Sequence, residues 1–291
     1  MRKKRVLAVN VLVKEQQLTK KELARKLGIS RQSLYYKPKK PEQDWMLKTK
    51  IENIFHTHPS YGYRRLAIAL TVNTKRIRRV MNLYGLRPYR RRPKKYRKKR
   101  DEGRIATPYQ NLLQVTPFPS KSNTVWVSDF THIRFHCRWL YLATVMDLYT
   151  REIVGWYILN KHSVDLVEGA LIQALTKRIP PTILHSDQGS EYASKRYTRF
   201  VQHHGIRVSM SKKSSPWENG YQESFYSQFK LDLGDTSRCE HMGELIVAIH
   251  NAIYSYNNTR IHTALKMPPA VYAMRQYQNQ ERSVRSSDYV S

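Results

Sequence analysis

Three carboxylates occupy positions from which they could hold metal ions. Asp129 lies in an alternating stretch, Asp187 ends a short apolar run, and 35 residues separate Asp187 from Glu223. Carboxylates from separate elements can hold two divalent cations about 4 Å apart, an arrangement that promotes in-line displacement at phosphorus. Mg²⁺ suits such a site because it takes few carboxylates and keeps waters and phosphate oxygens. We therefore predict that all three carboxylates are both catalytic residues and ligands of two Mg²⁺ ions, for which Mn²⁺ is expected to substitute.

Other charged residues lie close to these three in the sequence. Lys230 follows Glu223 by seven residues, so a helix would place both on one face, and we expect Lys230 to bind a phosphate near the reacting bond. Glu218 and Asp147 are rival acids. Glu218 is near a helix start, where the helix dipole favours acids, and Asp147 is in a turn-like segment. We interpret both as structural. Any single carboxylate is commonly a surface residue, so the prediction depends on the set.

The charge of the chain is large and unevenly placed. Its formal net charge is +30, with 32 Lys and Arg against 7 Asp and Glu in residues 1–110, and 20 against 15 in residues 111–291. Such asymmetry indicates a polyanionic partner for the N-terminal part. A merely solvated basic surface explains it poorly, because this much self-repulsion destabilises a compact state. We predict nucleic acid as the partner.

Cysteine content and hydropathy limit the cellular location. Cys137 and Cys239 are too few for a disulfide framework or a cysteine-based zinc site, and they fit a reducing compartment. Residues 1–13 resemble a signal peptide faintly, but small cleavage-site residues do not follow them. No segment reaches the roughly 18 apolar residues that a membrane span needs. We expect a cytoplasmic, nucleoid-associated protein without a membrane partner.

Residues 1–40 are predicted to contain a helix-turn-helix. Thr19 can cap a first helix, Gly28 would end it, and Ser30 can cap a second. The second helix of this motif enters the DNA major groove, so Arg31 and Gln32 are predicted to contact DNA. A plain helical hairpin has the same pattern, but the basic residues around it favour DNA.

Residues 41–86 are predicted to form a second helical DNA-binding unit. A helix over 45–55 precedes a second helix after the stretch 61–65, and Asn73 or Thr74 caps a third that ends near Gly85. The third helix could read a groove or only touch phosphates, and its sequence leaves both open. The basic residues predicted to bind DNA in this unit are Arg64, Arg65, Lys75, Arg76, Arg78 and Arg79.

Residues 87–121 are interpreted as a basic linker arm. Residues 87–104 are too charged to fold alone, and we expect them to lie along a phosphate backbone. A flexible spacer without contacts is the alternative. The predicted DNA contacts in the arm are Arg90, Arg91, Arg92, Lys94 and Lys95.

Residues 122–240 have an α/β pattern. Alternation and periodicity predict strands over 125–133, 140–146, 152–159, 183–185 and 206–210, and helices over 163–178, 190–205 and after 216. This order predicts a five-stranded mixed sheet with helices on both faces. Asp187 then lies at the C-terminal end of a strand, where open α/β sheets place their sites. On the last helix, Tyr221, Phe225 and Phe229 are predicted to pack on the protein as one stripe.

Residues 241–291 are predicted to be a helical extension. Apolar spacing indicates a helix over 245–254, and the polar residues from Tyr277 onward are expected to fray. Arg260 and His262 could contact DNA or anchor the extension to the core, and the sequence favours neither. Arg260 is retained among the DNA-binding candidates.

Several spaced stretches resemble one known family. The chain resembles the catalytic, OrfB-type protein of the IS3 family of bacterial insertion-sequence transposases, within the retroviral-integrase-like DDE superfamily. The stretches that carry the resemblance are 61–65, 125–131, 185–192, 215–225 and 256–269, together with Lys230. They extend over nearly the whole chain.

The resemblance implies an RNase H-like core with Asp129, Asp187 and Glu223 as its acidic triad. It also implies binding to the terminal inverted repeats of an element in double-stranded DNA, cleavage that frees a 3′-OH, and transfer of that hydroxyl to target DNA. Many members act as a fusion with the product of an upstream reading frame, so such a fusion or partner is a possibility here. Joining two element ends implies a homo-oligomer on DNA.

Two other functions remain as alternatives. A non-catalytic DNA-binding regulator derived from such an element would use only the N-terminal helices, and the complete set of carboxylates argues against it. An RNase H-like nuclease that degrades RNA is disfavoured by the helix-turn-helix and the basic arm.

Overall fold

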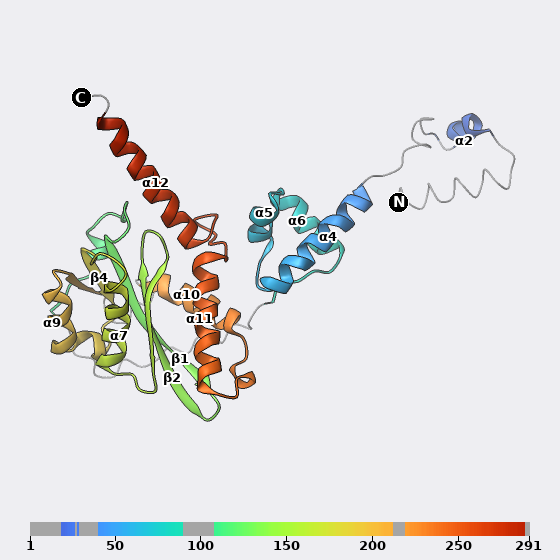
Figure 1. The fold of residues 1–291 in the computed structure, drawn as a ribbon. Coiled ribbons are helices and arrows are strands. Elements are labelled where there is room, and N and C mark those ends of the chain that lie inside the picture. The colour runs from blue at the N-terminus through green and yellow to red at the C-terminus, as the bar shows by residue number, and fades with distance from the viewer. Residues whose placement is uncertain (1–18, 27, 29–39, 90–107, 212–218, 289–291) are drawn as a thin grey trace. The chain divides into compact units, whose positions relative to one another are not determined.

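The structure, a computed structural model, describes residues 19–26, 28, 40–89, 108–211 and 219–288 (Figure 1). The chain divides into two compact units, residues 1–52 and 53–291. In the first unit, the Thr19 side chain and backbone both bond the Glu22 carboxylate, and the Glu22 amide donates to Thr19 Oγ1. This capping box begins α2 (Lys20–Lys26) as predicted. Arg31 and Gln32 lie outside the described residues.

Helix α4 (Lys40–Thr57) is followed by the pair α5 (Tyr63–Leu70) and α6 (Thr74–Leu83), which a turn of residues 71–73 joins. Thr71 has a φ of 53° and ends α5, and the Asn73 side chain caps α6 by accepting from the Lys75 amide at 2.8 Å. The predicted cap of the third helix is confirmed, and the short turn between two helices has the connectivity of a helix-turn-helix.

A five-stranded sheet forms the centre of the second unit. Its strands are β1 (Val125–Phe135), β2 (Arg138–Asp147), β3 (Ile153–Leu159), β4 (Ile183–Ser186) and β5 (Arg207–Met210). The order is β3-β2-β1-β4-β5. The β1–β2 and β2–β3 pairs are antiparallel, whereas β1–β4 and β4–β5 are parallel. The predicted mixed sheet is confirmed, and its order is that of the RNase H-like fold.

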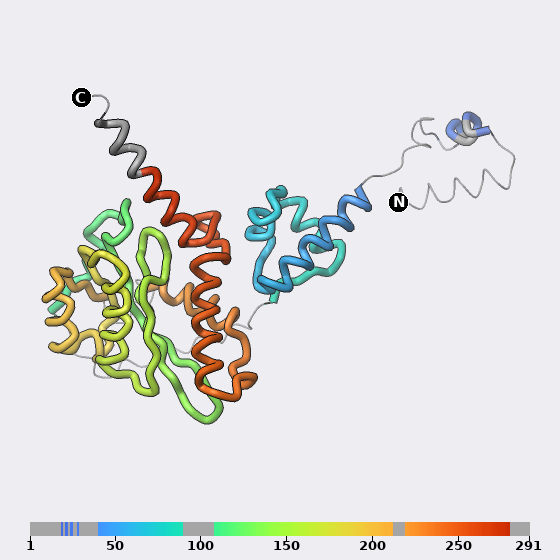
Figure 2. The backbone as a smooth tube through the Cα atoms, in the orientation of Figure 1, coloured from blue at the N-terminus to red at the C-terminus, as the bar shows by residue number. Residues whose placement is uncertain are grey.

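Helices cover both faces of the sheet, as predicted (Figure 1). One buried cluster joins the sheet to α7 (Val164–Leu175), α8 (Ser190–Ala193) and α9 (Lys195–His203). The other joins it to α10 (Gly220–Leu233) and α11 (Met242–Asn258), which Figure 2 shows as successive parts of the trace. Because side chains alternate along a strand, Val125 and Val127 pack toward α10 and α11 while Trp126 packs toward α7.

Gln110 and Leu112, in the described end of the predicted arm (residues 87–121), bond the edge strand β5 of the sheet. The Met210 amide donates to the Gln110 carbonyl at 3.2 Å, and the amide of Leu112 donates to Ser209 Oγ at 2.9 Å. Leu112 opens the short 3₁₀ helix η1 (Leu112–Gln114). The predicted arm contacts Arg90, Arg91, Arg92, Lys94 and Lys95 lie outside the described residues.

Three local predictions were wrong. The helix expected over 190–205 is two helices, because Ser194 has extended backbone angles and its side chain caps α9 by accepting from the Tyr197 amide. The tail expected to fray from Tyr277 belongs to α12 (Pro269–Asp288). Tyr221 is 39% exposed rather than packed with Phe225 and Phe229.

The 3₁₀ helix η3 (Thr236–Arg238) lies between α10 and α11.

Hydropathy along the helices also bears on the membrane prediction. Within the described ranges, no helix is both long and apolar enough to cross a bilayer.

Candidate active site

Asp129 lies in the middle of β1 and faces the helix that carries Glu223. Side chains alternate along a strand, so Asp129 lies on the same face of the sheet as Val125 and Val127, whose side chains pack in the cluster that contains α10. One carboxylate oxygen, Oδ1, accepts from the Phe130 amide at 2.8 Å. The central strand therefore presents this carboxylate from a rigid position.

Asp187 follows β4, the parallel neighbour of β1. Val125 pairs with Ile183 and Val127 with His185, so the same register places residue 187 beside residue 129 where β4 ends. The Gly189 amide donates to Asp187 Oδ1 at 2.9 Å. A Cβ at Gly189 would lie 3.0 Å from that oxygen and 3.2 Å from Glu191 Oε2, so glycine leaves the space that the two carboxylates occupy.

Burial and neighbouring charge make the ionised form of Asp129 unfavourable. Burial first, and then the charges of Asp187 and Glu223, raise the pKa of its carboxyl from 3.8 to about 8. The Phe130 amide and the Lys230 ammonium oppose this shift. Asp187, Glu223 and Lys230 thus all act electrostatically on Asp129, although the four residues come from three separate elements.

Glu223 is exposed in the first turn of α10. The structure brings Asp129 and Asp187 together at adjacent strands and puts Glu223 within electrostatic range of Asp129. Among the residues that the structure describes, no three His, Cys, Asp or Glu side chains gather closely enough to hold a metal ion.

The chemistry of these donors nevertheless fits a divalent cation. Asp129 and Asp187 supply carboxylate oxygens, the ligands that hard cations such as Mg²⁺ prefer. The partly buried Asp129 carboxyl, with a pKa of about 8, is also one whose ionised form a cation would stabilise.

Two polar residues that the sequence did not single out hold α10 to the sheet. Gln222 Nε2 donates to the Val127 carbonyl at 2.7 Å, and its Oε1 accepts from the Thr144 hydroxyl at 3.0 Å. The Tyr226 hydroxyl donates to the Asp129 carbonyl at 2.6 Å and lies 2.8 Å from Thr144 Oγ1. Both side chains are buried and flank Glu223 in the sequence, so they position its helix. Their spacing of four residues is a signal that could have found them.

We expect Tyr226→Phe to lower both stability and activity. The substitution leaves the Asp129 carbonyl and the Thr144 hydroxyl without this partner in a buried site, at a cost of about 1–3 kcal/mol. Urea unfolding measures the stability. Tyr254→Phe on the exposed face of α11 is the matched control, and equal stability of the two variants would contradict the positioning role.

A fourth acid borders the site and was not predicted. Glu191 is buried and its Oε1 lies 2.6 Å from His162 Nδ1. Burial acts to raise the pKa of Glu191, but the hydrogen bond from His162 and those from its own backbone and Ser190 hold that pKa below its usual value. Its place in the stretch 185–192, four residues after Asp187, could have indicated it.

The rival acid Asp147 has the structural role that we expected. Its Oδ1 accepts from the amides of Tyr149 and Thr150, both at 2.9 Å, and its Oδ2 accepts from the Asn123 amide at 2.6 Å. It therefore shapes the turn between β2 and β3. The other rival, Glu218, lies outside the described residues.

The predicted DNA-binding residues fall into different environments. On α6, Lys75, Arg76, Arg78 and Arg79 are all exposed, as is Arg64 on α5. Arg65 is partly buried and donates to Gln228 Oε1 on α10 at 3.2 Å.

Arg260 is only 2% exposed and is held by protein partners. Its Nη1 donates to Asp232 Oδ2 at 2.6 Å, and its Nη2 donates to Ser60 Oγ at 3.0 Å and to Gln228 Oε1. The structure therefore favours the anchoring interpretation of Arg260 over a DNA contact.

Models of the integrase core domain match residues 119–216 and 204–269. The putative transposase InsK for insertion sequence element IS150 of Escherichia coli K12 is 32% identical over 268 residues, covering 88% of this chain and 94% of that protein. The chain belongs to the IS3-family insertion-sequence transposases.

A second transposase is also similar to this chain. The transposase for insertion sequence element IS904 of Lactococcus lactis is 34% identical over 229 residues, covering 76% of this chain and 90% of that transposase. Among solved structures, the chain is similar to the HTLV-2 integrase catalytic core domain, with a TM-score of 0.44 and 17% identity over 53% of this chain and 98% of that one.

Proposed function

We propose that this IS3-family transposase binds the terminal inverted repeats of its element in double-stranded DNA, cleaves their 3′ ends and transfers those ends to target DNA. The observation that carries the proposal is the pair of adjacent strand carboxylates, Asp129 and Asp187, facing a helix that carries Glu223. The integrase core models cover all three residues.

In this mechanism Asp129, Asp187 and Glu223 would hold the metal, and the rigid strands fix the positions of the first two. Two Mg²⁺ ions, when bound, lower the pKa of the attacking water or 3′-OH and stabilise the leaving oxygen. Lys230, whose charge reaches Asp129, would bind a non-bridging phosphate oxygen. Gln222 and Tyr226 hold α10 so that Glu223 can meet the other two acids.

The test is an assay with purified full-length protein, Mg²⁺ and a labelled duplex that ends in the element's terminal repeat. Wild type is expected to nick the duplex at the repeat end and join it to a second duplex, whereas Glu223→Gln is expected to do neither. Glu240→Gln, which removes an exposed glutamate outside the site, is the matched control.

The assay also distinguishes the alternatives. Tight, end-specific binding without cleavage by wild type, restored by the product of the upstream reading frame, would show that a partner chain is needed. The same binding without restoration would favour the DNA-binding regulator, and cleavage confined to the RNA strand of a hybrid would favour the nuclease. We also propose that the active form is a homo-oligomer, since two ends must be joined.

The helix-turn-helix α5–α6 is proposed to bind the duplex through α6, whose first turn presents Lys75 and Arg76. The N-terminal residues of such a second helix contact base edges. Lys75→Gln/Arg76→Gln is expected to weaken binding and to lower the slope of log Kd against log salt by about 0.9 for each phosphate that the variant no longer neutralises.

Filter binding over a salt series, with terminal-repeat and unrelated duplexes, measures this effect. If α6 contacts base edges, the variant loses more affinity for the terminal-repeat duplex than for the unrelated duplex. If α6 contacts only phosphates, its affinities for the two duplexes fall by the same factor. Lys195→Gln/Arg199→Gln on α9 carries the same charge change. A drop in affinity in that control equal to the drop in the α6 variant would contradict a role specific to α6.

A further inference from the structure

A small cavity beside α10 is lined by an unusual number of basic side chains. Its volume is about 60 Å³, and its described lining includes no acidic residue. Arg65 of α5, Arg151 of the turn before β3, and His262 from the segment after α11 all line it. Arg260 lines it too, but its guanidinium already pairs with Asp232.

Three nitrogens around this cavity are buried without a hydrogen-bond partner among the described residues: Arg65 Nε, Arg151 Nη1 and His262 Nδ1. Buried polar atoms in folded proteins nearly always have partners, since each one that lacks a partner costs about 1–3 kcal/mol. Three in one cavity indicate a missing acceptor. Burial first, and then the positive charges of Arg151, Arg65 and Arg260, lower the pKa of His262 to about 4.

The backbone at Arg151 is strained in a way that serves this arrangement. Arg151 has a φ of 64°, a left-handed conformation that glycine or asparagine would adopt more easily. Its guanidinium stacks 3.9 Å from the Tyr221 ring centroid and 5.3 Å from that of Phe118. The two rings fix the direction of the guanidinium at the cavity, and strain of this kind gathers at functional sites.

We propose that this cavity is an oxyanion site that takes one phosphate group. The cavity's volume of about 60 Å³ leaves room for one small tetrahedral oxyanion. Arg65, Arg151 and His262 supply donors, and Ser224 can add a hydroxyl. Tyr221 and Ser224 lie on either side of Glu223 in the sequence, so the anion binds next to the proposed catalytic helix.

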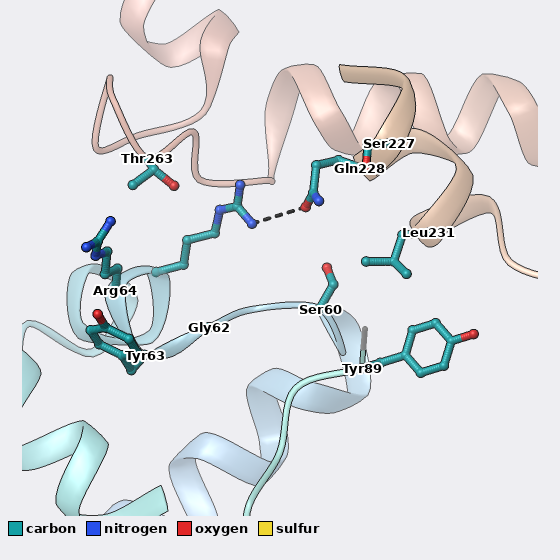
Figure 3. A pocket seen from close by; sticks show the side chains of 10 residues that line it. Ser60, Gly62, Tyr63, Arg64, Tyr89, Ser227, Gln228, Leu231 and Thr263 are labelled. Atoms are coloured by element: carbon teal, nitrogen blue, oxygen red, sulfur yellow. Dashed lines mark hydrogen bonds between the residues drawn. The ribbon is translucent and has the colours of Figure 1, made fainter. Parts of the chain in front are cut away.

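A larger cavity of about 460 Å³ lies on the other side of the Arg65–Gln228 hydrogen bond, because both residues line both cavities. Figure 3 shows it with Tyr63 and Arg64 on one side, and Ser227 and Leu231 of α10 on the other. The phosphate could belong to DNA or be free inorganic phosphate. Only the DNA source rests on the proposed function.

The first experiment uses inorganic phosphate and the full-length chain in EDTA. Phosphate is expected to raise the melting temperature by about 2–4 °C above sodium chloride of equal ionic strength, once its concentration exceeds Kd several-fold. Arg151→Gln is expected to lose this increment. Arg199→Gln, at an exposed position on α9, removes the same charge and is expected to keep it.

His262→Gln provides a second variant of the same cavity if Arg151→Gln does not fold, and it is expected to reduce the increment. The proposal is overturned if phosphate does not raise the melting temperature of wild type above the sodium chloride control. It is also overturned if Arg199→Gln loses as much of this rise as Arg151→Gln does. Neither measurement depends on DNA cleavage, so failure of the proposed function would leave this test unchanged.

The second experiment identifies the source of the phosphate. Terminal-repeat duplexes that carry one neutral methylphosphonate at successive positions are bound by wild type and by Arg151→Gln. If a DNA phosphate occupies the site, a methylphosphonate at one position weakens DNA binding by wild type but does not weaken binding by Arg151→Gln further. A double-mutant cycle gives this result for two groups in contact. Additive effects at every position, together with a retained phosphate increment, would show that the site takes free phosphate.

Discussion

Asp129→Asn is expected to abolish cleavage and strand transfer while raising the stability of the metal-free protein. The activity loss should be roughly 10³-fold or more, the scale seen when one member of a catalytic set is removed. The gain in stability follows because the amide keeps the shape of the carboxyl group but neither takes up a proton on folding nor carries, above pH 8, a charge that Asp187 and Glu223 repel. We expect a rise of several degrees in melting temperature in EDTA.

The effect of this substitution depends on pH in a defined direction. Burial first, and then the charges of Asp187 and Glu223, raise the pKa of Asp129 from 3.8 to about 8, so between these values the folded protein holds a proton that the unfolded chain has released. The contribution of this group to stability therefore falls as pH rises from about 4 to about 8 and stays level above that. Unfolding in EDTA across this range should show the fall in wild type and a flatter profile in Asp129→Asn.

Metal and a control variant complete this test. Mg²⁺ should stabilise wild type most at the upper end of the range, because a cation offsets the buried charge, and it should stabilise Asp129→Asn less. Glu240→Gln, at an exposed position, should follow wild type. A variant that is less stable than wild type in EDTA at pH 8 would contradict this account of the site.

Arg260→Met is expected to destabilise the fold by about 3–5 kcal/mol, the cost of leaving one partner of a buried ion pair uncompensated. The uncompensated group is Asp232, which accepts from Arg260 at 2.6 Å and whose pKa burial already raises. Loss of the guanidinium also removes donors to Ser60 and Gln228. Chemical unfolding measures the loss.

The ion pair can be tested by a double-mutant cycle. Arg260→Met/Asp232→Leu replaces both charges by apolar groups and should be less destabilised than Arg260→Met alone. This outcome would separate the anchoring role from the DNA contact that the sequence left equally open. Unchanged stability with weakened DNA binding would instead make Arg260 a DNA contact.

Much of the fold could be predicted from local patterns. Alternation and helical periodicity placed all five strands and most helices, because each pattern reflects burial of one face of a single element. Caps such as Thr19 and Asn73 were predictable because they act within four residues. The predicted single helix over 190–205 failed at Ser194, where a side chain competes with the helix for backbone amides.

The candidate acids were predictable for a related reason. The alternating and apolar patterns placed Asp129 within a strand and Asp187 at the end of another, whereas the parallel pairing of these two strands was seen only in the structure. The sequence alone also determined the family, since its spaced motifs extend over nearly the whole chain.

Only the tertiary structure showed which contacts the other polar residues make. Arginines such as Arg260 and Arg151 are usually expected at the surface, yet Arg260 is buried against Asp232 and Arg151 stacks on Tyr221. Gln222 and Tyr226 look like ordinary helix residues but bond the backbone of β1. These roles depend on contacts between residues far apart in the chain, and local periodicity carries no information about the partner that a buried polar group will meet.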